Sequence, residues 1–454
     1  MCGSRLHRAV LALQGASRVV VGARRSDRPR QPPPPVRPTP RCSARRRLEV
    51  EAAPRPNTDH HISERHHDDH RPAVEGAVSA RDYSHAPIAS ALVRVAVDAT
   101  PLVGPRTGVG RFVESVLPRL GRLEGIEARP YVLSRSARAS ELPDGARRVI
   151  VPAGVAVKSW GRGGPSFAWA FPQADAIHGT NYIGPPGPHT VVTVHDCTFV
   201  TAPERCTPTV AAFGPVVRRV AASGGWIHAL SEHVAAEARE LFATSRVVAV
   251  HLAAGEVSET PESASVGRLA PDAPFILSLA TLEARKNLPR LVQAFAAVAA
   301  RQPDVMLVLA GPDGPDAPAV RDAIEALPAA TRERVRTPGF VDDDERAALL
   351  TGATVLAYPS LDEGFGLPML EAWQHDVPVV AARARALPEI AGDAARLVDP
   401  LDVDALAGAL EDTLTDAAAR ASLVARGRRR LDAFSWDATV EGLVSIYRRA
   451  MERE

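Results

Sequence analysis

Residues 358–371 spell YPSLDEGFGLPMLE, and this stretch decides which fold the chain can adopt. It continues the apolar run TVLAYPS, which is typical of a buried strand, and it leads into a helix predicted over 366–375. Gly364 and Gly366 allow a tight turn with close approach of the backbone to a ligand. Pro368 suits the first turn of a helix, where its missing N–H costs nothing. Free amides at such a helix start attract anions, so the pattern predicts an anion site.

Two carboxylates flank the predicted anion site. Glu363 lies just before the turn, and Glu371 lies inside the expected helix. Carboxylates at these positions are placed to hold hydroxyl groups on either side of a diphosphate. Taken alone, each could instead be a capping acid or a surface acid of the helix.

The second half of the chain alternates strands and helices around this stretch. Its expected strands cover 275–280, 305–311, 334–340, 354–360 and 377–382. Its expected helices cover 287–301, 318–328, 342–351, 366–375, a region near 402–432, and 435–451. Such alternation predicts a parallel sheet that helices cover on both faces.

The first half shows the same alternation from Val93 onward. Its expected strands cover 93–99, 176–180, 190–196, 226–230 and 247–252, and its expected helices include 208–222 and 231–243. A glycine-bearing loop, 104–110, follows the first of these strands and precedes a helical run. A polar, irregular stretch at 256–273 separates the two series.

We therefore expect an α/β chain with two facing, doubly wound, Rossmann-like domains. The first domain is expected over 93–262 and the second over 270–432, and a C-terminal helix over 435–454 is expected to pack back toward the first. Ligands bind beyond the carboxyl ends of the strands in such sheets, so the cleft between the domains is the expected site.

Two adjacent cations lie in the segment TLEARKN, 281–287, between an expected strand and an expected helix. Lys is a compact point charge and Arg a planar fork, so Arg285 and Lys286 can serve different oxygens of one anion. The chain holds only two lysines, Lys158 and Lys286, which makes chance placement of one of them here less expected.

Glu363 and Glu371, with GFG between them, resemble the E-x7-E motif of the retaining glycosyltransferases of family 4, which have the GT-B fold. Other segments resemble the same family in the same order. They are GVG (108–110), HGTN (178–181), VHD (194–196), TLEARKN (281–287), GFV (339–341) and PEI with a later glycine (388–392). The similarity covers about residues 93–450. Ala284 stands where the family usually has proline, which affects the stiffness of the loop and not the chemistry.

The resemblance implies a role for each matched residue of the second domain. Glu363 would contact hydroxyls of the donor sugar, and Glu371 would accept hydrogen bonds from the ribose. Arg285 and Lys286 would neutralise the diphosphate as it leaves, because preorganised cations stabilise developing negative charge. The other donor-binding residues of this domain would be Phe340 and Val341 at the base, and Gly364, Phe365, Gly366 and Leu367 at the diphosphate.

In the first domain, Gly108 and Gly110 would let the backbone approach the donor phosphate or the acceptor. His195 would lie at a strand end, as a contact of the sugar and the transition state. Asp196 is its neighbour, with capping of the next segment as the alternative. The family is described as using front-face displacement, in which the leaving phosphate takes the proton of the acceptor, so His195 is not assigned as a base.

The sequence thus predicts a retaining hexosyltransferase that moves a sugar from a GDP- or UDP-linked donor to a saccharide or lipid-linked acceptor. Mannose from GDP-mannose is favoured, because the TLEARKN segment resembles a branch of mannosyltransferases of bacterial polysaccharide pathways. No cofactor and no metal is expected. A UDP-sugar donor, an epimerase and a nucleotide-sugar-binding protein stay as alternatives. A nicotinamide dehydrogenase is disfavoured, since GVG is not a full GxGxxG followed by an acid.

Composition narrows the partners and the compartment. A net charge of +1 gives no global indication of a nucleic-acid partner, and no apolar run reaches the roughly 18 residues that span a bilayer. Four cysteines without a CxxC pair exclude a disulfide scaffold and fit a reducing, cytoplasmic compartment. A peripheral contact with the inner face of the plasma membrane stays open, through the aromatic patch 160–171 or the helix 208–222.

Residues 1–88 are rich in Arg, Pro and His and are expected to be disordered, because such a stretch buries too little apolar area to offset its ordering entropy. Four alternatives compete with that interpretation. They are a transit peptide, arginines that bind anionic lipid or RNA, a metal-binding histidine cluster at 60–70, and a start codon assigned too early.

Overall fold

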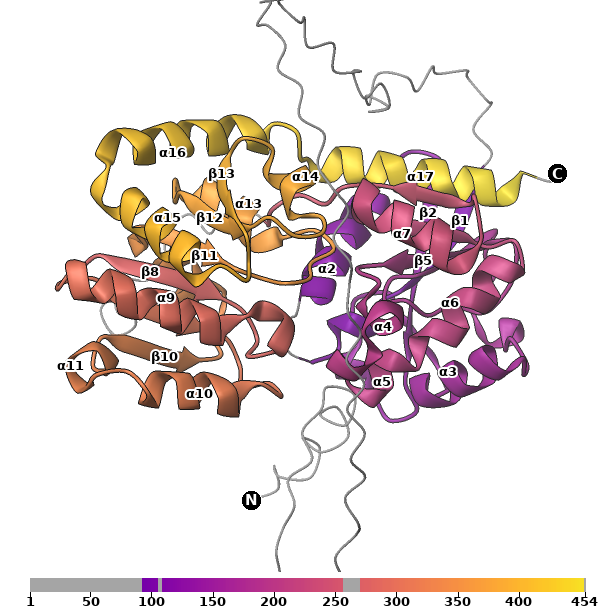
Figure 1. Cartoon of the computed structure of the whole chain (residues 1–454). Helices are drawn as coiled ribbons and strands as arrows, with labels where there is room; N and C mark the ends of the chain where they lie inside the picture. The colour runs from indigo at the N-terminus through magenta and orange to yellow at the C-terminus, as the bar shows by residue number, and fades with distance from the viewer. Residues whose placement is uncertain (1–91, 105–107, 256–269, 453–454) are drawn as a thin grey trace, which may run out of the picture. The chain divides into compact units, whose positions relative to one another are not determined.

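The computed structural model describes residues 92–104, 108–255 and 270–452. These residues form two parallel β-sheets with helices packed on both faces of each (Figure 1). The tail expected over 1–88, with its proposed histidine cluster, lies outside the described residues, as does most of the stretch expected at 256–273. Across the described ranges, no helix is both long enough and apolar enough to cross a membrane.

The first sheet has seven strands in the order β3-β2-β1-β4-β5-β6-β7, all parallel. The strands are β1 (Val93–Asp98), β2 (Ile126–Leu133), β3 (Arg147–Val149), β4 (Ala176–Gly179), β5 (Thr190–Val194), β6 (Trp226–Ala229) and β7 (Val247–Ala249). The helices of this half are α2 (Gly108–Leu120), α3 (Ala153–Arg162), α4 (Thr198–Thr201), α5 (Pro208–Ala211), α6 (Phe213–Ala222) and α7 (Glu232–Phe242), with short 3₁₀ turns η2 (Thr100–Leu102), η3 (Ala139–Glu141), η4 (Ala168–Ala170) and η5 (Pro203–Arg205).

The second sheet has six parallel strands in the order β10-β9-β8-β11-β12-β13. The strands are β8 (Phe275–Leu279), β9 (Met306–Ala310), β10 (Val335–Gly339), β11 (Val355–Tyr358), β12 (Val379–Ala382) and β13 (Ala395–Val398). The helices are α9 (Leu288–Arg301), α10 (Ala317–Glu325), α11 (Ala329–Arg332), α12 (Asp343–Gly352), α13 (Leu367–Gln374), α14 (Leu387–Ala391), α15 (Val403–Thr415) and α16 (Ala417–Leu431), preceded by the 3₁₀ turn η6 (Ala284–Lys286).

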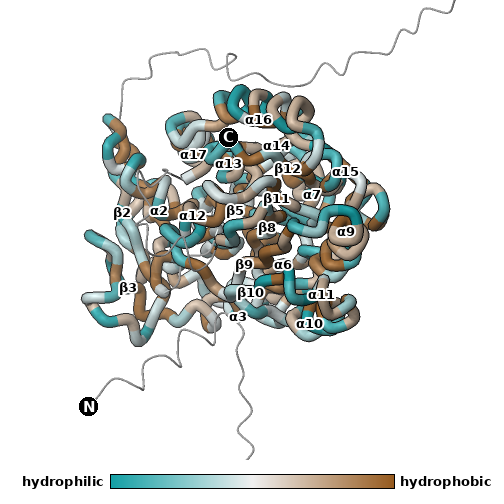
Figure 2. Tube along the Cα trace, turned by 90° about the vertical axis from the view of Figure 1, so that its left-hand side faces the viewer, coloured by the Kyte–Doolittle hydropathy of each residue, from teal (hydrophilic) through white to brown (hydrophobic). Residues whose placement is uncertain are grey.

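Successive residues of each central strand feed opposite faces of the sheet, as strand geometry requires. In β1, Val95 and Val97 join the core shared with α2, whereas Ala96 joins the core shared with α3, α6 and α7. In β8, Leu277 faces α12 and α13, whereas Ile276 faces α9 and α15. The apolar colour therefore concentrates on the central strands in Figure 2.

The last helix, α17 (Trp436–Met451), returns to the first sheet. It packs against α2, β4, β5 and β6, and it buries Leu443, Ile446 and Tyr447 there. The predicted fold class, two doubly wound sheets with a C-terminal helix that crosses back, is therefore confirmed.

Several local predictions were wrong. The helix expected over 208–222 is interrupted between α5 and α6, because Pro215 has no N–H to continue the helical hydrogen bonds from the preceding turn. The loop expected over 104–110 is shorter, since Gly108 and Gly110 already belong to the first turn of α2. The strands β2, β3 and β13 were not predicted.

Candidate active site

The predicted cations and the predicted acid follow neighbouring strands of the second sheet. The strand order reverses between β8 and β11, which pair directly. The segment with Arg285 and Lys286 follows β8, and the segment with Glu363 follows β11. Such a switch point opens a crevice at the carboxyl ends of the strands, which is where open α/β sheets bind their ligands.

Glu363 bridges the two cations. The Nζ of Lys286 donates to its Oε1 at 2.5 Å, and an Nη of Arg285 donates to its Oε2 at 3.1 Å. Lys286 and Glu363 are both buried, at 8% exposure each. Arg285 also donates through Nε to Glu283 at 3.0 Å. The three residues that the sequence assigned to the reaction centre of this domain therefore form one cluster around the buried Glu363.

The cluster fixes the charges of its members. Burial alone would raise the pKa of Glu363, but the nearby Lys286 and Arg285 outweigh it and lower that pKa to about 2. The pKa of Lys286 is lowered by burial and by the neighbouring Arg285, while Glu363 opposes that shift. Glu363 is therefore ionised at neutral pH, and it accepts hydrogen bonds without being able to donate a proton.

Backbone contacts hold the two segments together. The amide of Leu361 donates to the carbonyl of Arg285 at 2.7 Å. Asn287 has a positive φ of 59° where η6 meets α9, and its side-chain amide donates to the carbonyl of Pro359 at 3.0 Å and to that of Pro400 at 2.7 Å. The positions of both cations are thus set by the ends of three strands.

The turn GFG leads into α13 as expected. Gly366 is the N-cap residue of this helix with φ of 111°, a conformation that favours glycine. The amides of Phe365, Gly366 and Leu367 find no acceptor among the residues that the structure describes. The first amides of a helix lack intrahelical partners, so this turn presents free donors of the kind that bind phosphate groups.

His195 of the first sheet meets this turn through its backbone. A Cβ added to Gly364 would lie 1.5 Å from the carbonyl oxygen of His195, so only glycine permits this approach. The hydroxyl of Ser231, the residue before α7, donates to the carbonyl of Gly364 at 2.9 Å. The loop that carries Glu363 therefore touches the first half of the chain at two points.

The His195 ring is neutral and held on one side. Its Nε2 donates to the carbonyl of Thr180 at 2.9 Å, so Nδ1 is the acceptor nitrogen. Burial lowers its pKa, and Phe112 and Tyr182 contact the ring edge-on at 6.0 and 5.2 Å between centroids. Asp196 accepts from the amide of Thr198, the first residue of α4, at 3.0 Å.

Glu371 and Arg111, the residue after Gly110, line a separate part of the site. Glu371 pairs with Arg346 of α12, and Arg111, next to Gly110, pairs with Asp343 at the start of α12. A cavity of about 400 Å³ lies among these groups. It is lined by residues of α2, α12 and α13, including Arg111, Arg346, Leu367 and Glu371.

The expected base contacts follow β10. Phe340 is 57% exposed, and Val341 is buried against the core. They lie immediately before α12, whose N-cap Asp342 forms a capping box with Glu345. The described residues contain no group of three or more His, Cys, Asp or Glu side chains arranged to hold a metal ion.

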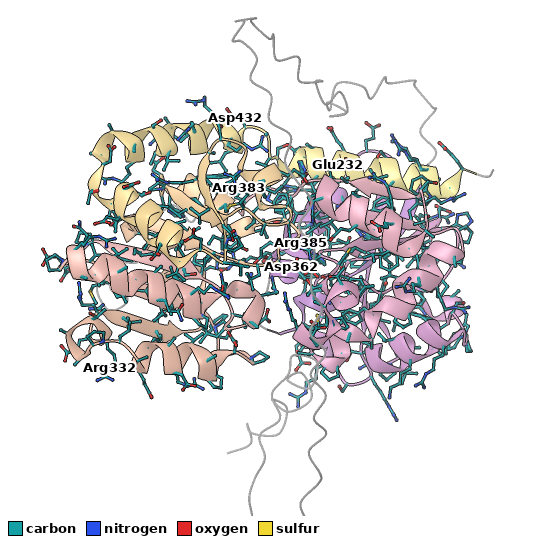
Figure 3. The ribbon with its side chains drawn as sticks, in the orientation of Figure 1. Glu232, Arg332, Asp362, Arg383, Arg385 and Asp432 are labelled. Atoms are coloured by element: carbon teal, nitrogen blue, oxygen red, sulfur yellow. The ribbon has the colours of Figure 1, made fainter. Side chains whose placement is uncertain are left out.

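The sequence analysis missed the residues that contact the site residues but lie far from them in the sequence. Arg346 lies in an unremarkable polar helix, so nothing marked it as the partner of Glu371. Asp362 and Arg385 lie where the two halves meet (Figure 3), with 3.8 Å between Arg385 Nε and the Asp362 carboxylate. Ser231 and Glu389 did carry a signal: the first begins the helix predicted over 231–243, and the second belongs to the PEI segment, which was given no role.

Comparisons with known proteins agree with this geometry. The profile of the family described as Glycosyl transferases group 1 matches residues 259–430. The chain is 35% identical over 179 residues to the O-antigen chain mannosyltransferase B of Escherichia coli, a match that covers 38% of this chain and 45% of that protein. The matches span less than half the length of the curated relatives.

Solved structures show the same fold. WaaG, a glycosyltransferase involved in lipopolysaccharide biosynthesis, superposes with a TM-score of 0.61 at 17% identity, covering 78% of this chain and 99% of WaaG. Anabaena Alr3699/HepE in complex with UDP-glucose superposes with a TM-score of 0.58 at 17% identity, covering 78% of this chain and 98% of HepE. Residues 259–430 thus match the glycosyl transferases of group 1, and the two sheets with the returning helix have the GT-B fold of these glycosyltransferase structures.

Proposed function

We propose that this chain transfers a sugar from a nucleotide-sugar donor to a hydroxyl of a saccharide or lipid-linked acceptor, with retention at the anomeric carbon. The cluster of Glu363, Arg285 and Lys286, beside the free amides at the start of α13, carries the proposal. Cations and amides suit a diphosphate, and a carboxylate that cannot lose its charge suits the hydroxyls of a sugar.

The proposed reaction needs no protein nucleophile. The bond between the anomeric carbon and the phosphate oxygen breaks, and the acceptor oxygen bonds to that carbon on the same face. The proton of the acceptor hydroxyl passes to an oxygen of the leaving diphosphate. Arg285, Lys286 and the amides of residues 365–367 stabilise the negative charge that develops there. His195 contacts the sugar from the other side, with its acceptor Nδ1.

The remaining donor contacts are assigned from where the residues lie relative to the predicted diphosphate turn. Glu371 receives the ribose hydroxyls, and Phe340 and Val341 receive the base. Gly108 and Gly110, at the start of α2, let the backbone approach the donor phosphate or the acceptor, with Asp196 as a further contact. The lining of the cavity by Leu367 and Glu371 supports this placement, since both follow the predicted diphosphate turn.

GDP-mannose is the proposed donor. The identity with an Escherichia coli O-antigen mannosyltransferase supports mannose and a place in bacterial polysaccharide synthesis. Asp343 supports guanine, because its carboxylate lies two residues after Val341 and is 65% exposed. A carboxylate accepts from the adjacent N1–H and N2–H of guanine, whereas uracil offers a single N–H between two carbonyls. A UDP-sugar is the alternative, the kind of donor with which HepE was solved.

We propose a cytoplasmic location, with a peripheral contact at the inner face of the membrane when the acceptor is lipid-linked. Trp169, at 82% exposure, supports such a contact. Trp160 and Phe171 of the same aromatic stretch do not, because both are buried in the core.

A ligand panel with turnover tests the proposal. In a thermal-shift panel with GDP, UDP, ADP and NAD, we expect GDP to give the largest shift. The shift is measurable, because a ligand at 100 times its Kd stabilises the folded chain by about 2.7 kcal/mol. GDP-mannose turnover should be lost in Glu363→Ala. Asp343→Asn should weaken GDP about tenfold relative to UDP, while Asp344→Asn, one residue further along α12, serves as the matched control. A shift with UDP alone would contradict the proposed GDP-linked donor. Equal nucleotide release by wild type and Glu363→Ala would contradict the proposed catalytic activity.

A further inference from the structure

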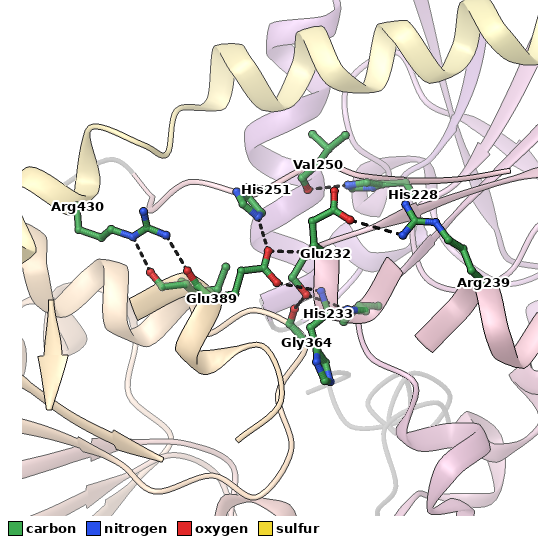
Figure 4. A network of polar contacts seen from close by, with 12 residues as sticks. His228, Glu232, His233, Arg239, Val250, His251, Gly364, Glu389 and Arg430 are labelled. Carbon is green, nitrogen blue, oxygen red and sulfur yellow. Dashed lines mark hydrogen bonds and ion pairs between the residues drawn. The ribbon is translucent and has the colours of Figure 1, made fainter. Parts of the chain in front are cut away.

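Glu389 of the PEI segment binds three donors from the first half of the chain (Figure 4). Its Oε1 accepts from the backbone amide of Glu232 at 2.8 Å and from Nε2 of His251 at 2.8 Å. Its Oε2 accepts from the backbone amide of His233 at 2.9 Å. The carboxylate belongs to α14, in the second half, so these bonds join the two halves.

The two amides are the first two of α7. The first four amides of a helix have no intrahelical partner, and the helix dipole places partial positive charge there. A carboxylate at this position therefore satisfies two open donors and lies where negative charge is stabilised. Burial alone would raise the pKa of Glu389, but the bonds from His251 and the two amides keep that pKa below its ordinary value.

The same end of α7 holds the loop that carries Glu363 and the GFG turn, which we call the donor loop. Ser231, the N-cap residue of α7, accepts from the amide of Val234 at 3.2 Å and donates to the carbonyl of Gly364 at 2.9 Å. The ring of His251 contacts Phe365, with 5.9 Å between the centroids. Ser231, which directly precedes the two amides, and His251, which itself binds Glu389, thus contact the two residues that follow Glu363.

Both sides of the contact between Glu389 and the first half of the chain are anchored by further hydrogen bonds. Arg430 of α16 donates to the carbonyls of Glu389 and Ile390, at 2.7 and 2.9 Å, and so holds α14 in place. Thr439 of α17 donates to the carbonyl of His251 at 2.7 Å. Since α14 and His251 are each anchored, a displacement of one half against the other must break the bonds of Glu389.

We infer that Glu389 is a positioning residue that latches the two halves together and sets the donor loop against the strand end of His195. This inference rests on the proposed function. Glu389 acts through α7 and touches no substrate. The cations and Glu363 lie on the second sheet and His195 on the first, so their relative placement depends on contacts of this kind. A misplacement of about 1 Å at a reaction centre costs roughly a hundredfold in rate.

Hydrogen exchange of the full-length chain tests the latch directly. The amides of Glu232 and His233 bond to Glu389, whereas that of Val234, one residue on, bonds to Ser231. Glu389→Ala should speed exchange at the first two amides about tenfold and leave Val234 nearly unchanged. Glu411→Gln is the matched control, because it breaks an ion pair with Arg301 inside the second half alone.

Steady-state kinetics test the consequence for the proposed reaction. Glu389→Gln keeps the size of the side chain but turns one acceptor oxygen into a donor. We expect a kcat for GDP-mannose turnover that is roughly ten- to a hundredfold lower, with a Kd for GDP within about twofold of wild type, because the proposed contacts of the base and the ribose and the two cations belong to the second half. Glu411→Gln should retain both constants.

The outcomes separate the latch from the proposed function. If the amides of Glu232 and His233 exchange alike in wild type and Glu389→Ala, the latch is wrong. If Glu389→Gln turns over at the wild-type rate, or loses GDP affinity in step with kcat, the positioning role is wrong. A wild-type chain that binds no nucleotide and turns over no sugar counts against the proposed function, and the exchange data still decide the latch.

Discussion

Gly364 is the residue at which the donor loop touches the first half of the chain. A Cβ there would overlap the carbonyl of His195 at 1.5 Å, and because that atom belongs to the backbone it cannot rotate away. We expect Gly364→Ala to separate the loop from His195 and to lower kcat by roughly a hundredfold. Nucleotide binding should change little, since the cations and amides stay on the second sheet. Steady-state kinetics and GDP titration check this.

The control for that change is Gly408→Ala. Gly408 lies inside α15 with open space where a Cβ would go. The substitution should leave kcat unchanged and raise the free energy of unfolding by about 0.5–1 kcal/mol. Wild-type kcat in Gly364→Ala would show that the close approach is dispensable.

At the scale of elements, Asn287 sets how η6 passes into α9. Its side chain bonds two strand-end carbonyls, and its φ of 59° is unfavourable for residues with a Cβ. Asn287→Gly removes the bonds and keeps the conformation, so we expect a loss of about 2 kcal/mol. Asn287→Ala should lose about 1 kcal/mol more. Urea unfolding measures both, and equal losses would mean that the backbone strain is not felt.

The elements that were predicted share one physical property. Central strands such as β5 and β8 are buried on both faces, so their sequences are nearly continuous apolar runs. The missed strand β2 contains Glu127, Arg129 and Pro130, which are only partly buried. A strand next to the sheet edge can carry such residues, and then neither composition nor alternation distinguishes it from a loop.

At the scale of the whole molecule, the same distinction separates the site residues. Glu363, Arg285 and Lys286 were predictable, because segments that follow neighbouring parallel strands meet at one edge of the sheet. The pairing of Glu371 with Arg346 depends on how two helices lie side by side. The bonds of Glu389 depend on how the two halves of the chain meet. Sequence patterns record local periodicity, and they carry no information on how helices or halves of the chain are oriented relative to one another.

A chain of buried hydrogen bonds ties the returning helix to the first sheet. His228 Nε2 must donate to the carbonyl of Val250, at 3.0 Å, so its Nδ1 accepts from the hydroxyl of Thr193. That hydroxyl accepts from His178 Nε2, and His178 Nδ1 accepts from Tyr447 of α17 at 2.7 Å. The carbonyl of Val250 thus fixes the direction of every hydrogen bond in this chain when both histidines are neutral.

This requirement makes the docking of α17 sensitive to acid. Burial lowers the pKa of His178 below its ordinary value and that of His228 to about 4. Between about pH 6.5 and 4 the unfolded chain binds more protons than the folded one, so stability should fall as pH falls through that window. His178→Gln should flatten the fall, and Tyr447→Phe, which leaves Nδ1 without a donor, should cost about 1–3 kcal/mol at pH 7. Urea unfolding at pH 7 and pH 5 decides, and parallel losses in wild type and His178→Gln would show that His178 does not titrate on unfolding.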